Sequence, residues 1–205
     1  MIAAAILAGG GARRLGGRQK VLLTVGGRTI LDRQLAALSG LCAPIAVVGR
    51  GPEPAYAARG VDVLCDPEPW RGHGPMAGII AALAWSPAPY VLILAGDMPA
   101  IARDAVALLA HILEGVIADG HRPDAVVPVI AGAFEPLFAI YSTAAAAALT
   151  ASLAAGQRSV RALLGTGALI IRTVDEGALR AVDPTLATFT NINSPDDFRC
   201  ADRIE

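Results

Sequence analysis

The chain has 205 residues, of which 54% are hydrophobic and 17% are charged, and its formal net charge is -1. That apolar fraction excludes a disordered chain, because it supplies enough surface for a buried core. A net charge near zero provides no broad basic face for a nucleic-acid backbone, and no apolar run reaches the roughly 18 residues of a membrane span. We therefore predict one domain over residues 1–205 that binds neither nucleic acid nor a membrane.

The cysteines and the N-terminus favour an intracellular location. Cys42, Cys65 and Cys200 are odd in number and far apart, without a CxxC pair or neighbouring histidines. This spacing argues against a disulfide framework and against a zinc site. The first residues are apolar but lack the basic start of a secretory signal, so we expect a cytoplasmic protein.

The hydrophobic pattern predicts strands and helices in alternation. Residues 2–7 form an unbroken apolar run before glycines, as strands buried on both faces do. A helix follows at 29–40, where Thr29 and Asp32 form a capping box. Further strands are expected at 45–48, 61–65, 90–95, 125–130, 137–141 and 169–174. Further helices are expected at 76–85, 104–117, 142–155 and 159–164, and Ser194 and Pro195 would start a closing helix.

This order of elements predicts an α/β protein with a mostly parallel central sheet that is covered by helices on both faces. In such sheets ligands bind beyond the carboxyl ends of the strands. Candidate functional residues are therefore those that directly follow each strand.

The loop after the first strand has the composition of a phosphate cradle. Its sequence from Leu7 is LAGGGARRLGGRQK, and the glycines after Ala8, among them Gly9 and Gly10, let backbone N–H groups approach an anion. Arg13, Arg14 and Lys20 add positive charge. Neither the P-loop pattern nor the GxGxxG dinucleotide pattern is present. Lys20 is also the one lysine among 17 basic residues, which favours a site that needs a compact ammonium group.

Two acidic residues follow strands directly. Asp97 comes after the strongly apolar strand 90–95, where the phosphates of a nucleotide would lie. Mg²⁺ commonly binds through one or two carboxylates together with phosphate oxygens, so Asp97 is the predicted metal ligand. Asp66 follows strand 61–65 in the same way, although an Asp-Pro pair also starts turns.

Three further groups of residues stand near strand ends. The segment 72–78 opens a helix whose backbone amides would face the same crevice, and His73 within it is interpreted as a loop residue. Glu135, Asn191 and Asn193 place polar groups at other strand edges, where they would hold an acceptor or provide a second metal contact.

These segments resemble the molybdenum cofactor guanylyltransferases, or molybdopterin-guanine dinucleotide synthases (the MobA family). The resemblance covers nearly the whole chain and rests on LAGGGARRLGGRQK, DPEPWRGHGPMAGI, GDMP, EPLFAIY, GQRSVRALL and TNINSPDD. It implies a Rossmann-like, three-layer nucleotidyltransferase fold. It also implies Mg²⁺-dependent transfer of GMP from GTP to the phosphate of molybdopterin, with release of pyrophosphate.

The resemblance assigns roles to single residues. Asp66 would help to hold the nucleoside, and Asp97 would bind both GTP and Mg²⁺. GTP would also be bound by Leu7, Ala8, Gly9 and Lys20. Two positions depart from the family pattern: Gln19 replaces an acid before the lysine, and Val48 replaces an Asn near the guanine.

The expected mechanism is an in-line attack of the acceptor phosphate on the α-phosphorus. Asp97 with its Mg²⁺, Lys20 and Arg14 would neutralise the charge on the leaving pyrophosphate, without a covalent enzyme intermediate. Two alternatives stay open at this point: a related transferase that uses CTP or a sugar-phosphate acceptor, and a nucleotide-binding protein without catalysis. Proteins that deliver the cofactor, or molybdoenzymes that receive it, are the candidate partners for transient contact.

Overall fold

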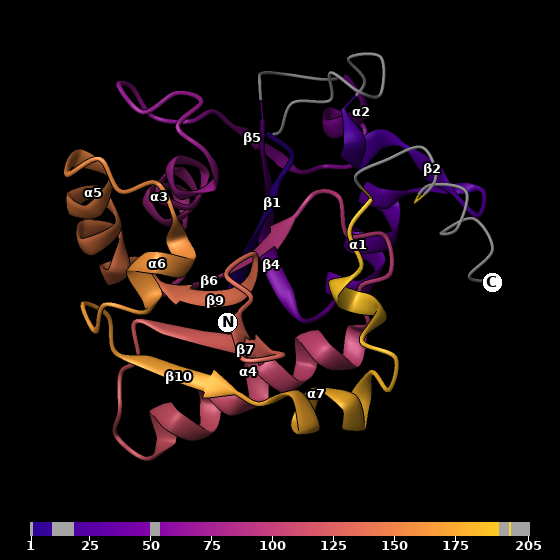
Figure 1. The fold of residues 1–205 in the computed structure, drawn as a ribbon. Helices are drawn as coiled ribbons and strands as arrows, with labels where there is room; N and C mark the ends of the chain where they lie inside the picture. The colour runs from indigo at the N-terminus through magenta and orange to yellow at the C-terminus, as the bar shows by residue number, and fades with distance from the viewer. Residues whose placement is uncertain (1, 10–18, 50–53, 193–196, 198–205) are drawn as a thin grey trace.

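A single large sheet runs through the computed structural model, which describes residues 2–9, 19–49, 54–192 and 197 (Figure 1). Its strands follow the order β10-β7-β9-β6-β1-β4-β5, and β8 pairs with β7 beside this path. The strands are β1 (Ile2–Leu7), β4 (Cys42–Val48), β5 (Asp62–Leu64), β6 (Tyr90–Ala95), β7 (Ala125–Ile130), β8 (Ala133–Phe134), β9 (Phe138–Ser142) and β10 (Ile171–Val174).

The sheet is mostly parallel, as predicted. Strand β1 lies between β4 and β6 and is parallel to both, and β5 continues this parallel half. Strand β9 is antiparallel to β6 and to β7. The reversal begins at a two-residue turn between β7 and β8, where Ala131 and Gly132 have φ of 49° and 77°. Positive φ at both positions is the geometry of a tight hairpin turn.

Helices cover both faces of the sheet and make three layers, also as predicted. One face packs against α1 (Ile30–Leu38), α4 (Arg103–Ala118) and α7 (Glu176–Val182). The other packs against α3 (Pro75–Trp85), α5 (Ala146–Ala154) and α6 (Val160–Leu164). Figure 1 shows these two groups of helices on opposite sides of the strands.

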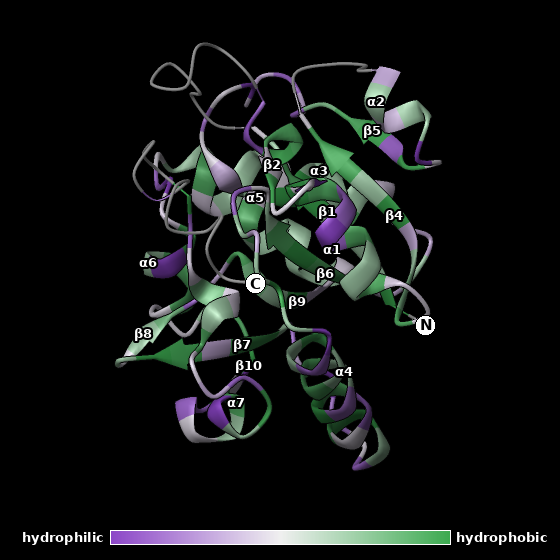
Figure 2. Ribbon diagram, turned by 90° about the vertical axis from the view of Figure 1, so that its right-hand side faces the viewer, coloured by the Kyte–Doolittle hydropathy of each residue, from purple (hydrophilic) through white to green (hydrophobic). Residues whose placement is uncertain are grey.

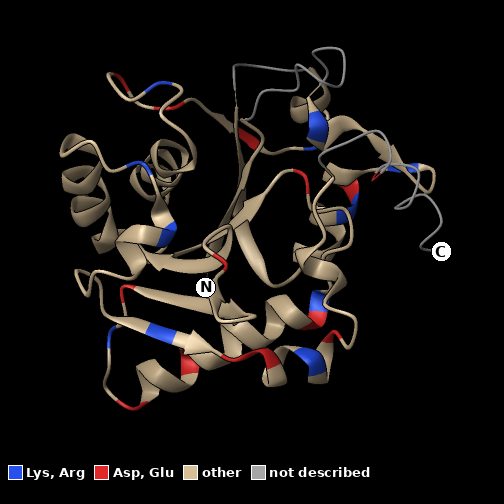
Figure 3. Cartoon of the chain, in the orientation of Figure 1, with Lys and Arg blue, Asp and Glu red and all other residues tan. Residues whose placement is uncertain are grey.

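Strand β1 is the centre of both cores. Ile2, Ala4 and Ile6 point to one core and Ala3, Ala5 and Leu7 to the other, because successive side chains of a strand alternate between faces. The central strands are correspondingly green in Figure 2, and Figure 3 shows the charged residues mainly on helix surfaces and connecting loops. An unbroken apolar strand is what burial on both faces requires.

The predicted elements are confirmed with shifted ends. The helix expected at 29–40 ends at Leu38, and its predicted cap is present: the Thr29 hydroxyl accepts a hydrogen bond from the Asp32 N–H. The helix expected at 142–155 starts with a 3-10 turn, η3 (Thr143–Ala145), because Ser142 still pairs with Tyr90 in the sheet. The strand expected at 169–174 begins only at Ile171. Ser194 and Pro195, at the expected closing helix, lie outside the described residues.

Several short elements were not predicted from the sequence. They are α7, β8, α2 (Pro54–Ala57), η2 (Lys20–Leu22), η4 (Ala187–Phe189) and the hairpin of β2 (Thr24–Val25) with β3 (Arg28–Thr29). Apart from α7, these elements have at most four residues, which is too short for a period of 2.0 or 3.6 residues to emerge from the sequence. Within the described part of the chain, no helix is both long and apolar enough to cross a membrane.

Two side chains of helix α1, Asp32 and Gln34, make polar contacts with distant segments of the chain. The Arg59 guanidinium binds both carboxylate oxygens of Asp32, at 2.7 and 2.9 Å, and this hydrogen bonding holds the pKa of Asp32 well below its usual range. Gln34 is fully buried, and its Nε2 donates to the carbonyl oxygens of Ala95 and Met98 at 2.8 and 3.0 Å. Gln34 thus ties α1 to the loop that follows β6.

We predict that Gln34→Met destabilises the fold by about 1–3 kcal/mol, the usual cost of one buried unpaired acceptor. The substitution keeps the approximate side-chain volume and takes this donor from two buried carbonyl oxygens, but it also removes Gln34 Oε1, a buried oxygen without a hydrogen-bond partner among the described residues. Urea unfolding monitored by circular dichroism would measure the difference. Gln157→Met is the matched control, because its exposed side chain loses only one solvent-accessible hydrogen bond, from the Ser159 N–H. Equal midpoints for the two variants would contradict the role given to Gln34.

Candidate functional site

The predicted lysine and aspartate meet at the carboxyl edge of the sheet. Lys20 Nζ lies 3.1 Å from Asp97 Oδ2, and the two side chains are 20% and 25% exposed. Lys20 begins η2 (Lys20–Leu22) after the glycine loop of β1, and Asp97 follows β6. Because β1 and β6 are adjacent and parallel, the loops after them come together. The contact joins residues that are 77 positions apart.

A third segment, near the C-terminus, completes this contact. Lys20 Nζ donates to the Ile192 carbonyl oxygen at 2.9 Å, and the Ile192 N–H donates to the Asp97 carbonyl oxygen at 2.9 Å. The sequence predicted Asn191 and Asn193 in this segment. Asn191 is exposed, and it is the backbone of the intervening Ile192 that touches both candidate residues. A backbone contact carries no residue-type signal, so the sequence could not reveal it.

Close backbone packing sets the position of Asp97. The Gly96 N–H donates to the Leu7 carbonyl oxygen at 3.0 Å. A Cβ atom on Gly96 would lie 2.9 Å from that oxygen and 3.2 Å from the Cα of Ala8, which leaves no room for a side chain. The Gly-Asp pair therefore has a steric reason: the glycine lets β6 end against the glycine loop, and the aspartate follows at once.

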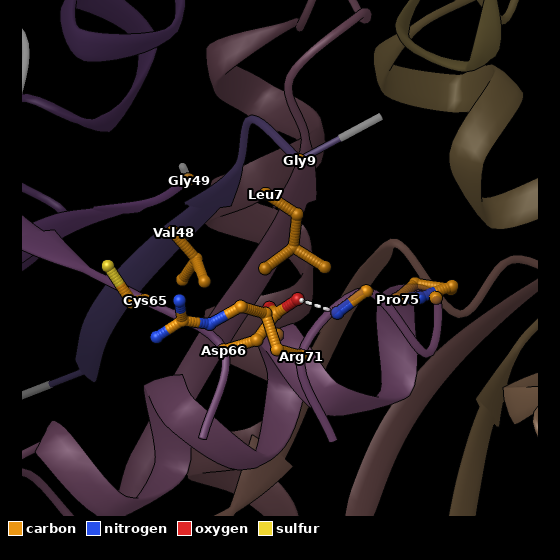
Figure 4. Close-up of a pocket in the computed structure, with 11 residues that line it drawn as sticks. Leu7, Gly9, Val48, Gly49, Cys65, Asp66, Arg71 and Pro75 are labelled. Atoms are coloured by element: carbon orange, nitrogen blue, oxygen red, sulfur yellow. Dashed lines mark hydrogen bonds between the residues drawn. The ribbon is translucent and has the colours of Figure 1, made fainter. Parts of the chain in front are cut away.

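Two adjoining cavities open beside the pair. The smaller, about 150 Å³, is lined by Lys20 and Asp97 and by the backbone around Ala8. The larger, about 550 Å³, lies over the ends of β1, β4 and β5 and is drawn in Figure 4. Leu7, Gly9 and Pro75 line both cavities. One elongated ligand could therefore occupy the two at once.

Asp66 belongs to the larger cavity. Its Oδ2 accepts a hydrogen bond from the Gly72 N–H at 2.9 Å, the contact marked by the dashed line in Figure 4. Asp66 lies two residues beyond the end of β5, because the strand expected at 61–65 ends at Leu64. Val48 also lines this cavity and is 2% exposed. Because its side chain is a valine, it presents only methyl groups to the cavity.

The start of α3 borders both cavities, because Pro75 lines each of them. Gly74 is the residue before the helix, with φ of 87°, and Pro75 occupies its first turn. Gly78 on this helix faces β1: a Cβ there would lie 3.2 Å from Leu7 Cδ2. The small residues of GPMAG thus bring the helix close to the strand, and its first turn faces the site.

Glu135 contacts another partner. Its Oε1 lies 3.3 Å from Arg161 Nη2, in a partly exposed ion pair. Burial raises the pKa of Glu135, and the positive charge of Arg161 acts in the opposite direction. Leu137, two residues further on, lines the smaller cavity, so Glu135 lies near that cavity without touching Lys20 or Asp97. Its part in acceptor binding stays a prediction.

Three predicted residues, Gly10, Arg14 and Asn193, lie outside the described residues. Within the described ranges, no group of three or more His, Cys, Asp or Glu side chains could enclose a metal ion. Among the described residues that line the smaller cavity, Asp97 is the one carboxylate. That arrangement differs from a protein-enclosed metal site, in which the protein supplies most of the ligands.

The chain resembles known proteins over nearly its whole length. A family model described as the MobA-like NTP transferase domain matches residues 4–171. A molybdenum cofactor guanylyltransferase of Desulfosudis oleivorans is 32% identical over 197 residues, which cover 96% of this chain and 92% of that protein. The crystal structure of molybdopterin-guanine dinucleotide biosynthesis protein A from Archaeoglobus fulgidus has a TM-score of 0.79 and 27% identity, covering 99% of this chain and 98% of that one.

A more distant structure shares the fold alone. The 2-C-methyl-D-erythritol 4-phosphate cytidylyltransferase of Thermus thermophilus gives a TM-score of 0.69 at 22% identity, with 98% of both chains covered. The family model spans most of this chain, and the Desulfosudis protein aligns over nearly its full length. The chain therefore belongs to the MobA-like NTP transferases and is a nucleotidyltransferase.

Proposed function

We propose that this nucleotidyltransferase transfers GMP from GTP to the phosphate of molybdopterin and releases pyrophosphate. The observation that carries the proposal is the Lys20–Asp97 pair, placed where the two cavities adjoin. An ammonium group and a carboxylate at one point suit a magnesium-bound triphosphate, because the ammonium group binds the negative phosphates and the carboxylate binds the positive metal ion. The relatives that align over nearly the whole chain are named for this reaction.

The dimensions of the cavities support one orientation of the nucleotide. The larger cavity, with Asp66 and apolar walls, suits a base with its ribose. The smaller cavity, with Lys20, Asp97 and the backbone around Gly9, suits the phosphates. In this arrangement the α-phosphate lies where the two cavities meet, beside Leu7, Ala8 and Gly9. We assign Gly10 and Arg14 to the same loop from the sequence.

The residues present fit a divalent metal ion. MobA-like nucleotidyltransferases generally depend on one, and we propose that here it is Mg²⁺. Magnesium is usually held by one or two carboxylates together with substrate phosphates, and a lone carboxylate beside the phosphate cavity matches that donor set. Asp97 would hold the ion, which supplies positive charge to the phosphates when it is bound. Asn193 or Glu135 would provide any further contact to the metal or to the acceptor.

The reaction needs positioning more than covalent chemistry. An oxygen of the acceptor phosphate forms a bond to the α-phosphorus, and the bond from that phosphorus to the bridging β-oxygen breaks, so pyrophosphate leaves with the electron pair. Lys20 lies at the cavity that would hold the leaving group and stabilises its charge. Backbone N–H groups of the glycine loop orient the phosphates.

We further propose that residues 1–205 act as one catalytic domain and that its substrates, GTP and molybdopterin, are bound without a nucleic acid. Contact with proteins that deliver the cofactor, or with the molybdoenzymes that receive it, stays a prediction from the family resemblance. Asn191, exposed beside Ile192, is a candidate for contact with the acceptor.

The purified protein should release pyrophosphate when it is given GTP, Mg²⁺ and molybdopterin. CTP and ATP in place of GTP should give markedly lower rates. A coupled pyrophosphate assay with each nucleotide tests both the reaction and the choice of base. Faster turnover with CTP would favour the cytidylyl alternative, and binding of GTP without pyrophosphate release would favour a non-catalytic protein.

Asp97→Asn should lower the rate of pyrophosphate release at least about 100-fold, since the neutral amide cannot hold the ion that stabilises the transition state. The side-chain volume is kept, so the thermal unfolding midpoint should change little. Asp119→Asn, on the exposed end of α4, is the control and should keep the parent rate. Parent activity in Asp97→Asn would contradict the assignment.

Lys20→Arg should be strongly impaired although the charge is kept. The ammonium nitrogen of Lys20 donates to both Asp97 Oδ2 and the Ile192 carbonyl oxygen. The donors of a guanidinium lie in one plane on separate nitrogens, so an arginine cannot reproduce this geometry. Steady-state kinetics with GTP would show a lower kcat/KM. Arg28→Lys, the reverse exchange on an exposed strand, serves as the control, and unchanged kinetics in Lys20→Arg would remove the argument from the ammonium group.

A further inference from the structure

The larger cavity offers few groups that could recognise a base. Its described lining is formed largely by glycines and apolar side chains, and Val48 contributes only methyl groups. Asp66 and Arg71 are the charged side chains among the described lining residues. Hydrogen bonds to base edges need polar partners, so these two side chains are the principal candidates for distinguishing one base from another.

The Asp66 carboxylate is fixed as an acceptor. Its Oδ2 is held by the Gly72 N–H at 2.9 Å. Its Oδ1 lies 3.7 Å from the place that a Cβ on Gly78 would take, so the absence of a side chain there keeps space around this oxygen. A base that reaches Asp66 must therefore present N–H donors.

The loop that carries Arg71 is ordered by its own contacts. The Trp70 N–H donates to the Pro67 carbonyl at 2.8 Å, and the His73 N–H donates to the Trp70 carbonyl at 3.0 Å. The Trp70 ring packs against the core on the α3 side of the sheet and meets the His73 ring edge to face, with centroids 5.9 Å apart. Arg71 thus extends from a loop whose backbone is held by hydrogen bonds on both sides of it, at Trp70 and His73.

Arg71 is placed to act as a donor in this cavity. Figure 4 shows its side chain extending in the direction of Cys65, which also lines the cavity. Its Nε pairs with Glu68 Oε1 at 3.0 Å, but both side chains are about two-thirds exposed, at 68% and 67%. Exposed ion pairs contribute little, so this one can yield to a ligand, and it does not engage the terminal nitrogens of the guanidinium.

We infer that Arg71 is a specificity-determining residue that donates to O6 of the guanine base. The inference rests on the proposed use of GTP. Guanine presents O6 as an acceptor beside N1–H and the 2-amino group as donors, which matches a guanidinium and a fixed carboxylate that line the same cavity. Adenine presents an amino group in place of O6 and lacks the N1 hydrogen, so it mismatches both side chains. Arg71 and Asp66 would thereby supply the base recognition that Val48, in place of an Asn, cannot provide.

The experiment compares Arg71→Met with the parent enzyme on three nucleotides, of which two carry O6 and one does not. GTP and inosine triphosphate carry O6, whereas 2-aminopurine riboside triphosphate lacks it. For Arg71→Met, kcat/KM should fall roughly 10- to 100-fold with GTP and with inosine triphosphate, the usual value of a good arginine–guanine contact. It should stay nearly unchanged with the 2-aminopurine nucleotide, which has no O6 to lose.

A matched variant and the pattern across the three nucleotides show whether the lost contact is the one to O6. Arg172→Met, on β10 at the opposite edge of the sheet, should leave all three values unchanged. Equal losses with all three nucleotides would overturn the inference, because they would indicate a contact with ribose or phosphate or a general loss of structure. Retention of the parent preference for GTP over the 2-aminopurine nucleotide would overturn it too. A parent enzyme that consumes no GTP would instead reject the proposed function itself.

Discussion

The contact between Lys20 and Asp97 is the interaction on which the site depends. It is possible only because β1 and β6 are adjacent and parallel, so that the glycine loop and the Gly-Asp turn leave the sheet at one edge. Gly96 permits the close approach, and the Ile192 backbone joins both partners from the far end of the chain. Three distant segments therefore converge on a few ångströms, and the fold can be understood as the scaffold that brings them there.

The two ends of the candidate site are built by different parts of the molecule. The proposed phosphate end uses the loops after β1 and β6, whereas the proposed base end uses the loop after β5 and the first turns of α3. The Thermus cytidylyltransferase shares the fold although its name refers to another nucleotide. A division of this kind lets the loop that contains Asp66 and Arg71 change without disturbing Lys20 and Asp97.

Sequence reasoning reached the fold and the central residues for a physical reason. Buried parallel strands are apolar throughout, so β1, β6 and β7 were predicted with their observed bounds, and Asp97 then followed from its place after β6. The reasoning failed where the determining contact is tertiary. Gln34 appears in the sequence as an ordinary helical residue, and only the structure reveals its hydrogen bonds to the loop around Asp97. The backbone of Ile192 left no residue-type signal. Helix α7 did carry signals that the prediction missed, namely the cap Asp175 and the Glu176–Arg180 pair.

The attachment of the C-terminal segment has a consequence for how this region tolerates change. Ile192 meets Lys20 and Asp97 through main-chain atoms alone, and any amino acid except proline carries the same N–H and carbonyl groups. Exchanges of side chains there are therefore compatible with the contact, within the limits of burial. A gained or lost residue between η4 and position 192 would instead shift the register and move both polar groups out of reach. In related chains the number of residues between η4 and position 192 should accordingly vary less than the residue types in this segment.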